Sequence, residues 1–251
     1  MVFNLKNKNN FSYSKKMNSI KSIITNSIYC AIGYSLFVFL LYLLPNFIRN
    51  NGALWDDLMD RLSFGYVEEE AVFIARFIIG TQGLHAIALI FINACYGVLY
   101  WSNIPIIEKY KSEQDPWPFH SKDPSVRREF FGLLYHSIGI IMFNNVCVSI
   151  PLSYFASRNS RFSVSLDDFP SNFTLLWHVI FCALIEDALF YWSHRIFHLK
   201  SVYPLIHKMH HKWHMPIALS AEYAHPVEFY FGNTLPFALG PGLLKCHMFT
   251  L

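Results

Sequence analysis

Long apolar runs without a charged residue dominate the chain. A bilayer core about 30 Å thick needs roughly 20 apolar residues at a rise of 1.5 Å each. Four runs come close to or exceed that length: 23–44, 83–101 within the uncharged stretch 77–107, 130–156 and 175–193. The pattern therefore predicts an all-α integral membrane protein with about four transmembrane helices.

A fifth apolar run, 229–244, differs from the other four. It is shorter, and helix-breaking residues interrupt it at Gly232, Pro236, Gly240, Pro241 and Gly242. We expect this run to be interfacial or re-entrant.

The chain divides into three regions by composition. Residues 1–22 are rich in Asn, Lys and Ser, and we expect a disordered, basic cytosolic arm. Residues 23–173 are expected to form transmembrane helices and connecting loops, of which the first is a retained signal anchor because its apolar core is too long for a cleaved signal. Residues 174–251 form a histidine-rich region.

Basic residues predict the orientation of these spans. With four spans and a cytosolic N-terminus, 15 of the 20 Lys and Arg residues fall on the cytosolic side. The five exceptions are Arg49, Arg61, Arg76, Arg158 and Arg161. The 102–129 loop and the histidine-rich region are therefore expected in the cytosol.

The overall composition supports a membrane protein and excludes other classes. The chain is 53% hydrophobic and 15% charged, whereas about 25% charged is usual for a soluble domain. A net charge of +3 offers no footprint for nucleic acid. The five Cys residues are scattered without metal or disulfide spacing, so we expect reduced packing residues.

Histidines are concentrated in one segment. Five of the 12 lie within residues 194–211: His194, His198, His207, His210 and His211. The spacings of four, and of three and four, place each set along one stripe of a helix. Imidazole ligands suit Zn, Fe, Cu and Ni, and the absence of nearby Cys argues against a structural thiolate zinc site. We therefore predict a helical metal-binding region where the fourth span leaves the bilayer.

Other polar residues near this segment have less certain roles. Asp187 precedes His194 by nearly two helical turns, so it is either a carboxylate that orients a metal-bound imidazole or a partner of Arg195 or a Lys. His225 is a candidate ligand. His214 is a ligand, a neighbour of the ligands or an interfacial residue. The isolated histidines are expected to be structural: His85, His120, His136, His178 and His247.

These motifs resemble the fatty acid hydroxylase/sterol desaturase superfamily, and most closely the C-4 methylsterol oxidases. The resemblance rests on His194-Arg-Ile-Phe-His198, His207-Lys-Met-His210-His211 and Ala221-Glu-Tyr-Ala-His225-Pro-Val-Glu228. It implies a non-haem di-iron centre on the cytosolic face of the endoplasmic reticulum membrane. It also implies O2-dependent oxidation of the 4-methyl group of a sterol, with NAD(P)H electrons delivered through a cytochrome b5-type donor.

By position, the resemblance names six metal ligands: His194, His198, His207, His210, His211 and His225. Sterol-biosynthesis enzymes are further expected partners. Members of the superfamily carry a third box of the type H-x-x-H-H, which the sequence to Leu251 lacks. Three hypotheses follow: a C-4 methylsterol oxidase or a shortened form of one, another sterol or fatty-acyl hydroxylase or desaturase, and a truncated, non-catalytic membrane protein that binds sterol or partner subunits.

Overall fold

A computed structural model describes most of the chain, and all of the secondary structure in that part is helical. The described residues are 35–36, 38–62, 69–109, 111, 115–159, 162–163 and 165–250. The chain divides into two compact units, Met1–Leu54 and Trp55–Leu251. The all-α prediction is confirmed for these residues.

The longer helices are labelled α, and the 3₁₀ and π segments are labelled η. In order they are η1 Phe39–Leu43, α2 Leu44–Asn50, α3 Gly52–Leu62, α4 Glu69–Ser102, α5 Pro105–Glu108, η2 Pro118–His120, α6 Pro124–Asn144, η3 Asn145–Ser149, α7 Ile150–Asn159, η4 Leu166–Asp168, α8 Asn172–Phe197, η5 His207–Lys212, η6 Ala218–Glu222, α9 Pro226–Glu228, η7 Phe229–Thr234, α10 Leu235–Leu244 and η8 Met248–Thr250.

The described part of the first unit is a short helical segment. Helix α2 begins with Leu44 and Pro45, and a proline in the first turn is tolerated because its missing N–H would have no partner there. Arg49 donates to Asn46 at 2.6 Å, and Asn51 donates to the Phe47 carbonyl at 2.8 Å. These contacts are local, within one turn of chain.

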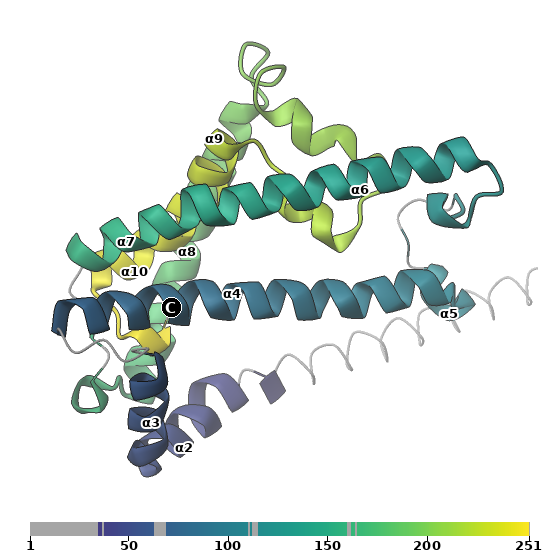
Figure 1. Ribbon diagram of the computed structural model, residues 1–251. Coiled ribbons are helices and arrows are strands. Elements are labelled where there is room, and N and C mark those ends of the chain that lie inside the picture. The colour runs from purple at the N-terminus through teal and green to yellow at the C-terminus, as the bar shows by residue number, and fades with distance from the viewer. Residues whose placement is uncertain are drawn as a thin grey trace, which may run out of the picture. The chain divides into compact units, whose positions relative to one another are not determined.

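Within the second unit, α4 packs beside the continuous helix formed by α6, η3 and α7 (Figure 1). Gln82 on α4 donates to the Ser153 hydroxyl at 2.7 Å. Arg158 at the end of α7 pairs with Glu70 at the start of α4, at 2.8 Å. The two long helices therefore run antiparallel, with the end of one beside the start of the other.

Asp123 starts the second of these helices. Its carboxylate accepts from the Ser125 backbone N–H at 2.8 Å, and Pro124 follows as the first helical residue, so two good N-terminal signals coincide. The π segment η3 then interrupts the regular hydrogen bonding just after Asn144, without ending the helix. Such π segments are frequent at functional sites.

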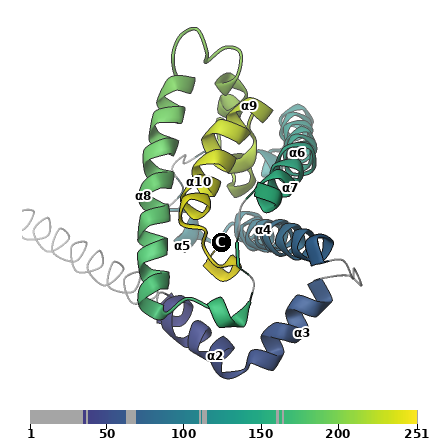
Figure 2. The same ribbon diagram turned by 90° about the vertical axis from the view of Figure 1, so that its left-hand side faces the viewer.

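The second pair of helices is α8 and α10, which lie side by side (Figure 2). The approach is close at Gly240, where an added Cβ would lie 2.9 Å from the Cys182 Cα. Both views show this pair running across the direction of α4 and α6 (Figures 1 and 2). Small residues allow helices in a membrane to approach so closely.

Replacing Gly240 by alanine is expected to destabilise the α8–α10 pair by about 1–3 kcal/mol, because the new methyl group meets backbone rather than a movable side chain. Gly242→Ala is the matched control on the same helix, since a Cβ there has no neighbour within 4 Å. Thermal or denaturant unfolding in detergent measures the difference. Equal stability of the two variants would contradict the close packing.

Three helices in the described residues are long and apolar enough to cross a membrane: Glu70–Ser102, Pro124–Arg158 and Asn172–Phe197. They contain the predicted runs 83–101, 130–156 and 175–193. Most of the run 23–44 lies outside the described residues. At 1.5 Å per residue the first two helices are about 50 Å long, so they would have to tilt to fit a 30 Å hydrocarbon core.

The fifth run, 229–244, is helical and packs along α8. It ends at Lys245, which adopts a left-handed backbone conformation with φ 51°. The following residues then contact other parts of the second unit: the Met248 N–H donates to the Ser163 carbonyl, and the Met248 side chain packs on Gly80 of α4. The run therefore forms one member of the α8–α10 pair. Its expected position at the membrane interface stays a prediction.

Candidate metal centre

The first two histidines lie in the last turn of α8. His194 and His198 are four residues apart, so their imidazoles share one face, and the two Nε2 atoms lie 3.2 Å apart. His198 is the C-cap residue of α8, and its backbone N–H donates to the His194 carbonyl. A helix C-terminus carries partial negative charge, which favours a cation beside this turn.

The next histidines come from the short 3₁₀ helix η5. His207 is fully buried, and its Nε2 lies 3.1 Å from that of His198 and 3.0 Å from that of His211. The Nε2 atoms of His194, His198 and His207 all lie within 4.8 Å of one another. We call the four residues whose Nε2 atoms converge the histidine cluster: His194, His198, His207 and His211.

The spacing of these nitrogens fits a metal ion. Two nitrogens bound about 2.1 Å from one ion lie about 3.0 Å apart at right angles, and about 3.4 Å apart in a tetrahedron. The contacts between successive cluster nitrogens measure 3.2, 3.1 and 3.0 Å. Neutral imidazole nitrogen is a common ligand of Fe, Zn, Cu and Ni. Successive cluster nitrogens are thus spaced as two nitrogens that bind one ion are, and His194, His198 and His207 form a group that could hold an ion.

Glu228 orients the central imidazole. Its Oε1 lies 2.6 Å from His207 Nδ1, and both side chains are buried. When Glu228 is ionised its carboxylate only accepts a hydrogen bond, so the His207 proton then sits on Nδ1 and the Nε2 lone pair faces the cluster. This is the ligand form of the ring.

Burial shifts the pKa values of both members of this pair. It raises the pKa of Glu228 to about 8. Burial, together with the neighbouring imidazoles, lowers the pKa of His207 to about 3. His207 is therefore neutral at physiological pH, as a ligand must be, and a cation in the cluster would favour the ionised carboxylate.

His210 is held in a similar way to His207, by a contact at its Nδ1 atom. Its Nδ1 lies 3.2 Å from the Tyr223 carbonyl oxygen, which can only accept, so Nδ1 carries the proton and Nε2 is free to bind a metal. Its ring stacks on His207 with centroids 5.5 Å apart. The α-helical stripe expected for His207, His210 and His211 is a 3₁₀ turn, and His211 rather than His210 joins the contacts between Nε2 atoms.

His225 has a different contact in this structure. Its Nδ1 accepts the backbone N–H of Val227 at 3.2 Å and so caps α9. In the neutral ring the proton then sits on Nε2, which is the opposite of the tautomer of His207. The ligand role of His225 stays a prediction.

The structure places Asp187 on an exposed part of α8. Among the described residues, the carboxylate that contacts a cluster imidazole is that of Glu228 rather than Asp187. Arg195, the alternative partner, instead donates to the Tyr191 hydroxyl at 2.6 Å. The orienting role of Asp187 stays a prediction. His214 is exposed, and no described contact connects it with the cluster.

Two buried hydrogen bonds connect the histidine-bearing loops to α6. The Asn144 amide donates to the Ala224 carbonyl at 2.9 Å, and Trp213 Nε1 donates to the Ser137 hydroxyl at 3.1 Å. Asn144 and Ser137 are both fully buried. These hydrogen bonds therefore connect α6 to Trp213, which follows η5, and to Ala224, which precedes α9.

Replacing Asn144 by leucine is expected to cost about 1–3 kcal/mol of stability, since the Ala224 carbonyl is left buried without its donor. Asn145→Leu is the matched control, because the Asn145 amide bonds only within its own helix, to Ile141. Unfolding in detergent, with the metal content measured in parallel, checks the pair of variants. An Asn144 variant as stable as the control would show that the hydrogen bond from Asn144 to Ala224 does not stabilise the protein.

The sequence pattern alone predicts no role for Glu228 or Asn144. Glu228 ends the motif Ala221–Glu228 and begins an otherwise apolar helical run, whereas Asn144 lies 50 residues before His194. No sequence signal links Asn144 to Ala224, because 80 residues separate them.

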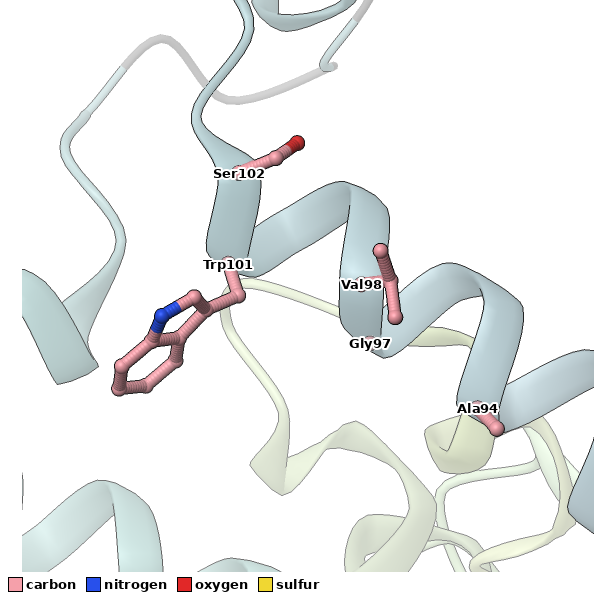
Figure 3. A pocket seen from close by; sticks show the side chains of 5 residues that line it. All are labelled: Ala94, Gly97, Val98, Trp101 and Ser102. Carbon is pink, nitrogen blue, oxygen red and sulfur yellow. The ribbon is translucent and has the colours of Figure 1, made fainter.

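A shallow hollow lies elsewhere, on the C-terminal half of α4 (Figure 3). Its lining residues are Ala94, Gly97, Val98, Trp101 and Ser102. These side chains are mostly apolar, and no His, Cys, Asp or Glu is among them.

Comparison with known proteins agrees with this site. Residues 179–251, which contain the whole cluster, match the family described as Fatty acid hydroxylase. A very-long-chain aldehyde decarbonylase of Oryza sativa subsp. indica is 33% identical over 175 residues, covering 69% of this chain and 60% of that protein. No solved structure matches.

Two further relatives match over shorter regions. Methylsterol monooxygenase 2-1 of Arabidopsis thaliana is 38% identical over 123 residues, covering 47% of this chain and 41% of the relative. Fatty acid hydroxylase domain-containing protein 2 of Homo sapiens is 34% identical over 117 residues, covering 46% and 35%. The matched regions thus span 60% or less of each relative.

The apolar helices and the histidine cluster together indicate a membrane protein with a candidate metal site. The chain belongs to the fatty acid hydroxylase/sterol desaturase superfamily, whose members are typically iron-dependent membrane oxygenases.

Proposed function

We propose that the protein is a membrane-bound, non-haem di-iron oxygenase of the C-4 methylsterol oxidase type. The convergence of the Nε2 atoms of His194, His198, His207 and His211 carries this proposal. His210 and His225 complete the proposed ligand set. The methylsterol type, rather than the superfamily alone, is favoured by the Ala221–His225 motif and by a methylsterol monooxygenase among the relatives.

Iron would supply the reactivity that side chains lack, because removing hydrogen from an unactivated methyl group with O2 requires a redox metal. The protein's own residues prepare the site. With a cation bound, ionised Glu228 would keep the His207 proton on Nδ1, and the Tyr223 carbonyl would do the same for His210. His207 is buried, whereas His198 and His211 are exposed, so one side of the cluster is closed and the other is open to substrate and O2.

The end of the molecule that holds the cluster is also basic and aromatic. Lys200, Lys208 and Lys212 are exposed around it, and Tyr191 and Trp192 flank it on α8. Such residues mark a membrane interface, and the basic ones favour the cytosolic side. We propose a multi-pass protein of the endoplasmic reticulum membrane with a cytosolic cluster. The three Lys side chains would attract an acidic electron donor such as a cytochrome b5-type protein, which carries NAD(P)H electrons.

Turnover by the purified chain tests the proposal. The protein is loaded with iron in lipid nanodiscs, and a reductant, O2 and a 4-methylsterol are supplied. We expect O2-dependent oxidation of the 4-methyl group. A very-long-chain aldehyde serves as the competing substrate because the rice relative is named for it. Turnover of the aldehyde alone would replace the sterol proposal, and iron binding without turnover of either would favour a non-catalytic, lipid-binding protein.

A further inference from the structure

A second polar contact lies inside a membrane-spanning helix, apart from the histidine cluster. His85 is near the middle of α4, and its Nε2 lies 3.3 Å from Oε1 of Glu222 on η6. The His85 side chain is 43% exposed, whereas that of Glu222 is 19% exposed. Ionisable residues are costly in a bilayer, and those that occur there commonly mark substrate or ion sites.

Segment η6 connects this pair to the cluster. The Ala218 N–H donates to the Tyr100 hydroxyl at 3.1 Å, which fixes η6 against α4. Glu222 is followed by Tyr223, whose carbonyl accepts from His210. Glu222 thus belongs to the same short segment as the carbonyl that orients a proposed ligand, and His85 contacts that segment from α4.

The pair retains unused hydrogen-bonding capacity. Glu222 Oε2 is buried and has no hydrogen-bond partner among the described residues. With Nε2 facing the carboxylate, the remaining ring nitrogen of His85, Nδ1, has no described partner, and the exposed ring is the accessible part of the pair. In lipid, no water is available to satisfy these groups, so the polar group of a lipid is a suitable partner.

We propose that the His85–Glu222 pair binds the hydroxyl group of a lipid alcohol and so positions the substrate beside the histidine cluster. This inference rests on the proposed function, since it names the substrate's polar group. A neutral His85 ring presents Nδ1 as an acceptor, and a charged ring presents it as a donor. A hydroxyl group satisfies either state because it both donates and accepts.

The same chemistry separates two substrate classes. An aldehyde only accepts a hydrogen bond, so it fits only the charged ring. A sterol is an alcohol, and in a 4-methylsterol the methyl-bearing carbon is next to the carbon that carries the hydroxyl group. A hydroxyl group anchored on His85 would therefore hold that methyl group two bonds from the ring carbon that carries the hydroxyl group.

Binding of a radiolabelled 4-methylsterol to the purified, full-length chain in nanodiscs tests this inference. No iron, reductant or O2 is added, so the result does not depend on turnover. We expect the wild type to bind the sterol about tenfold more tightly than its 3-O-methyl ether, which cannot donate. We expect His85→Phe and Glu222→Gln to lose about tenfold in affinity for the alcohol and little for the ether.

Asn93→Leu is the matched control on α4. It removes a polar side chain whose one hydrogen bond among the described residues goes to the Leu89 carbonyl of its own helix, so alcohol binding should stay at the wild-type level. Zinc content, measured in every variant, reports whether the cluster has kept its fold.

Three results would overturn the inference. The first is equal binding of alcohol and ether by the wild type, which tests the inference even where a variant fails to fold. The second is unchanged alcohol binding by both pair variants. The third is that a fatty aldehyde binds more tightly than the sterol and that this aldehyde binding is lost in the His85→Phe variant. A protein that binds the sterol through His85 but never oxidises it would leave this inference standing while overturning the proposed function.

Discussion

Replacing His207 by alanine is expected to remove bound metal from the protein. His207 is the central member of the cluster, because its Nε2 contacts those of both His198 and His211. Its loss removes one ligand and separates His211 from the pair on α8. The loss of affinity should exceed the 10–100-fold that is typical of changes outside the ligands themselves.

Metal analysis of the purified protein after equilibration with iron or zinc measures this effect. His178→Ala is the control, since His178 lies on the same helix as His194 but 16 residues earlier and on another face. The control should keep wild-type metal content. A His207 variant that also kept full metal content would show that the converging nitrogens do not form the metal site.

The second large effect is expected at Glu228. Replacing it by leucine leaves the His207 Nδ1–H buried without an acceptor and frees the ring to rotate or change tautomer. We expect metal affinity to fall about 10–100-fold, with Glu228→Gln intermediate because the amide oxygen still accepts but carries no charge. Competition with a chelator of known affinity measures the series.

Asp187→Asn is the informative comparison for this series. Asp187 is exposed and, among the described residues, the acceptor at the cluster is Glu228. Wild-type metal affinity in the Asp187 variant, together with weakened binding in the Glu228 variants, would assign the orienting carboxylate to Glu228. The reverse result would restore the role that the sequence suggested for Asp187.

Hydrophobicity in the sequence was sufficient to predict the membrane-crossing helices. The runs 83–101, 130–156 and 175–193 each lie inside a helix long enough to span a bilayer. The length of an uncharged, apolar run is enough to identify such helices, so few details of tertiary packing matter for this prediction. The direction in which the α8–α10 pair crosses α4 and α6 was not predictable, because contacts between residues far apart in the sequence determine it.

The histidine spacing predicted the location of the site but not its internal geometry. The pair on α8 follows the expected helical stripe, since His194 and His198 do lie in one α-helix. The second box forms a 3₁₀ turn, which changes the direction of each ring and selects His211 for the contact with His207. Buried partners such as Glu228 and Asn144 depend on tertiary packing, which no local pattern reports.

X-ray absorption spectroscopy of the iron-loaded, full-length chain tests the central claim most directly. The account predicts nitrogen neighbours at about 2.1 Å, with the outer-shell scattering of several imidazole rings per iron, and a loss of that signal in the His207→Ala protein. Iron bound only by oxygen ligands, or imidazole scattering that persists unchanged without His207, would contradict it.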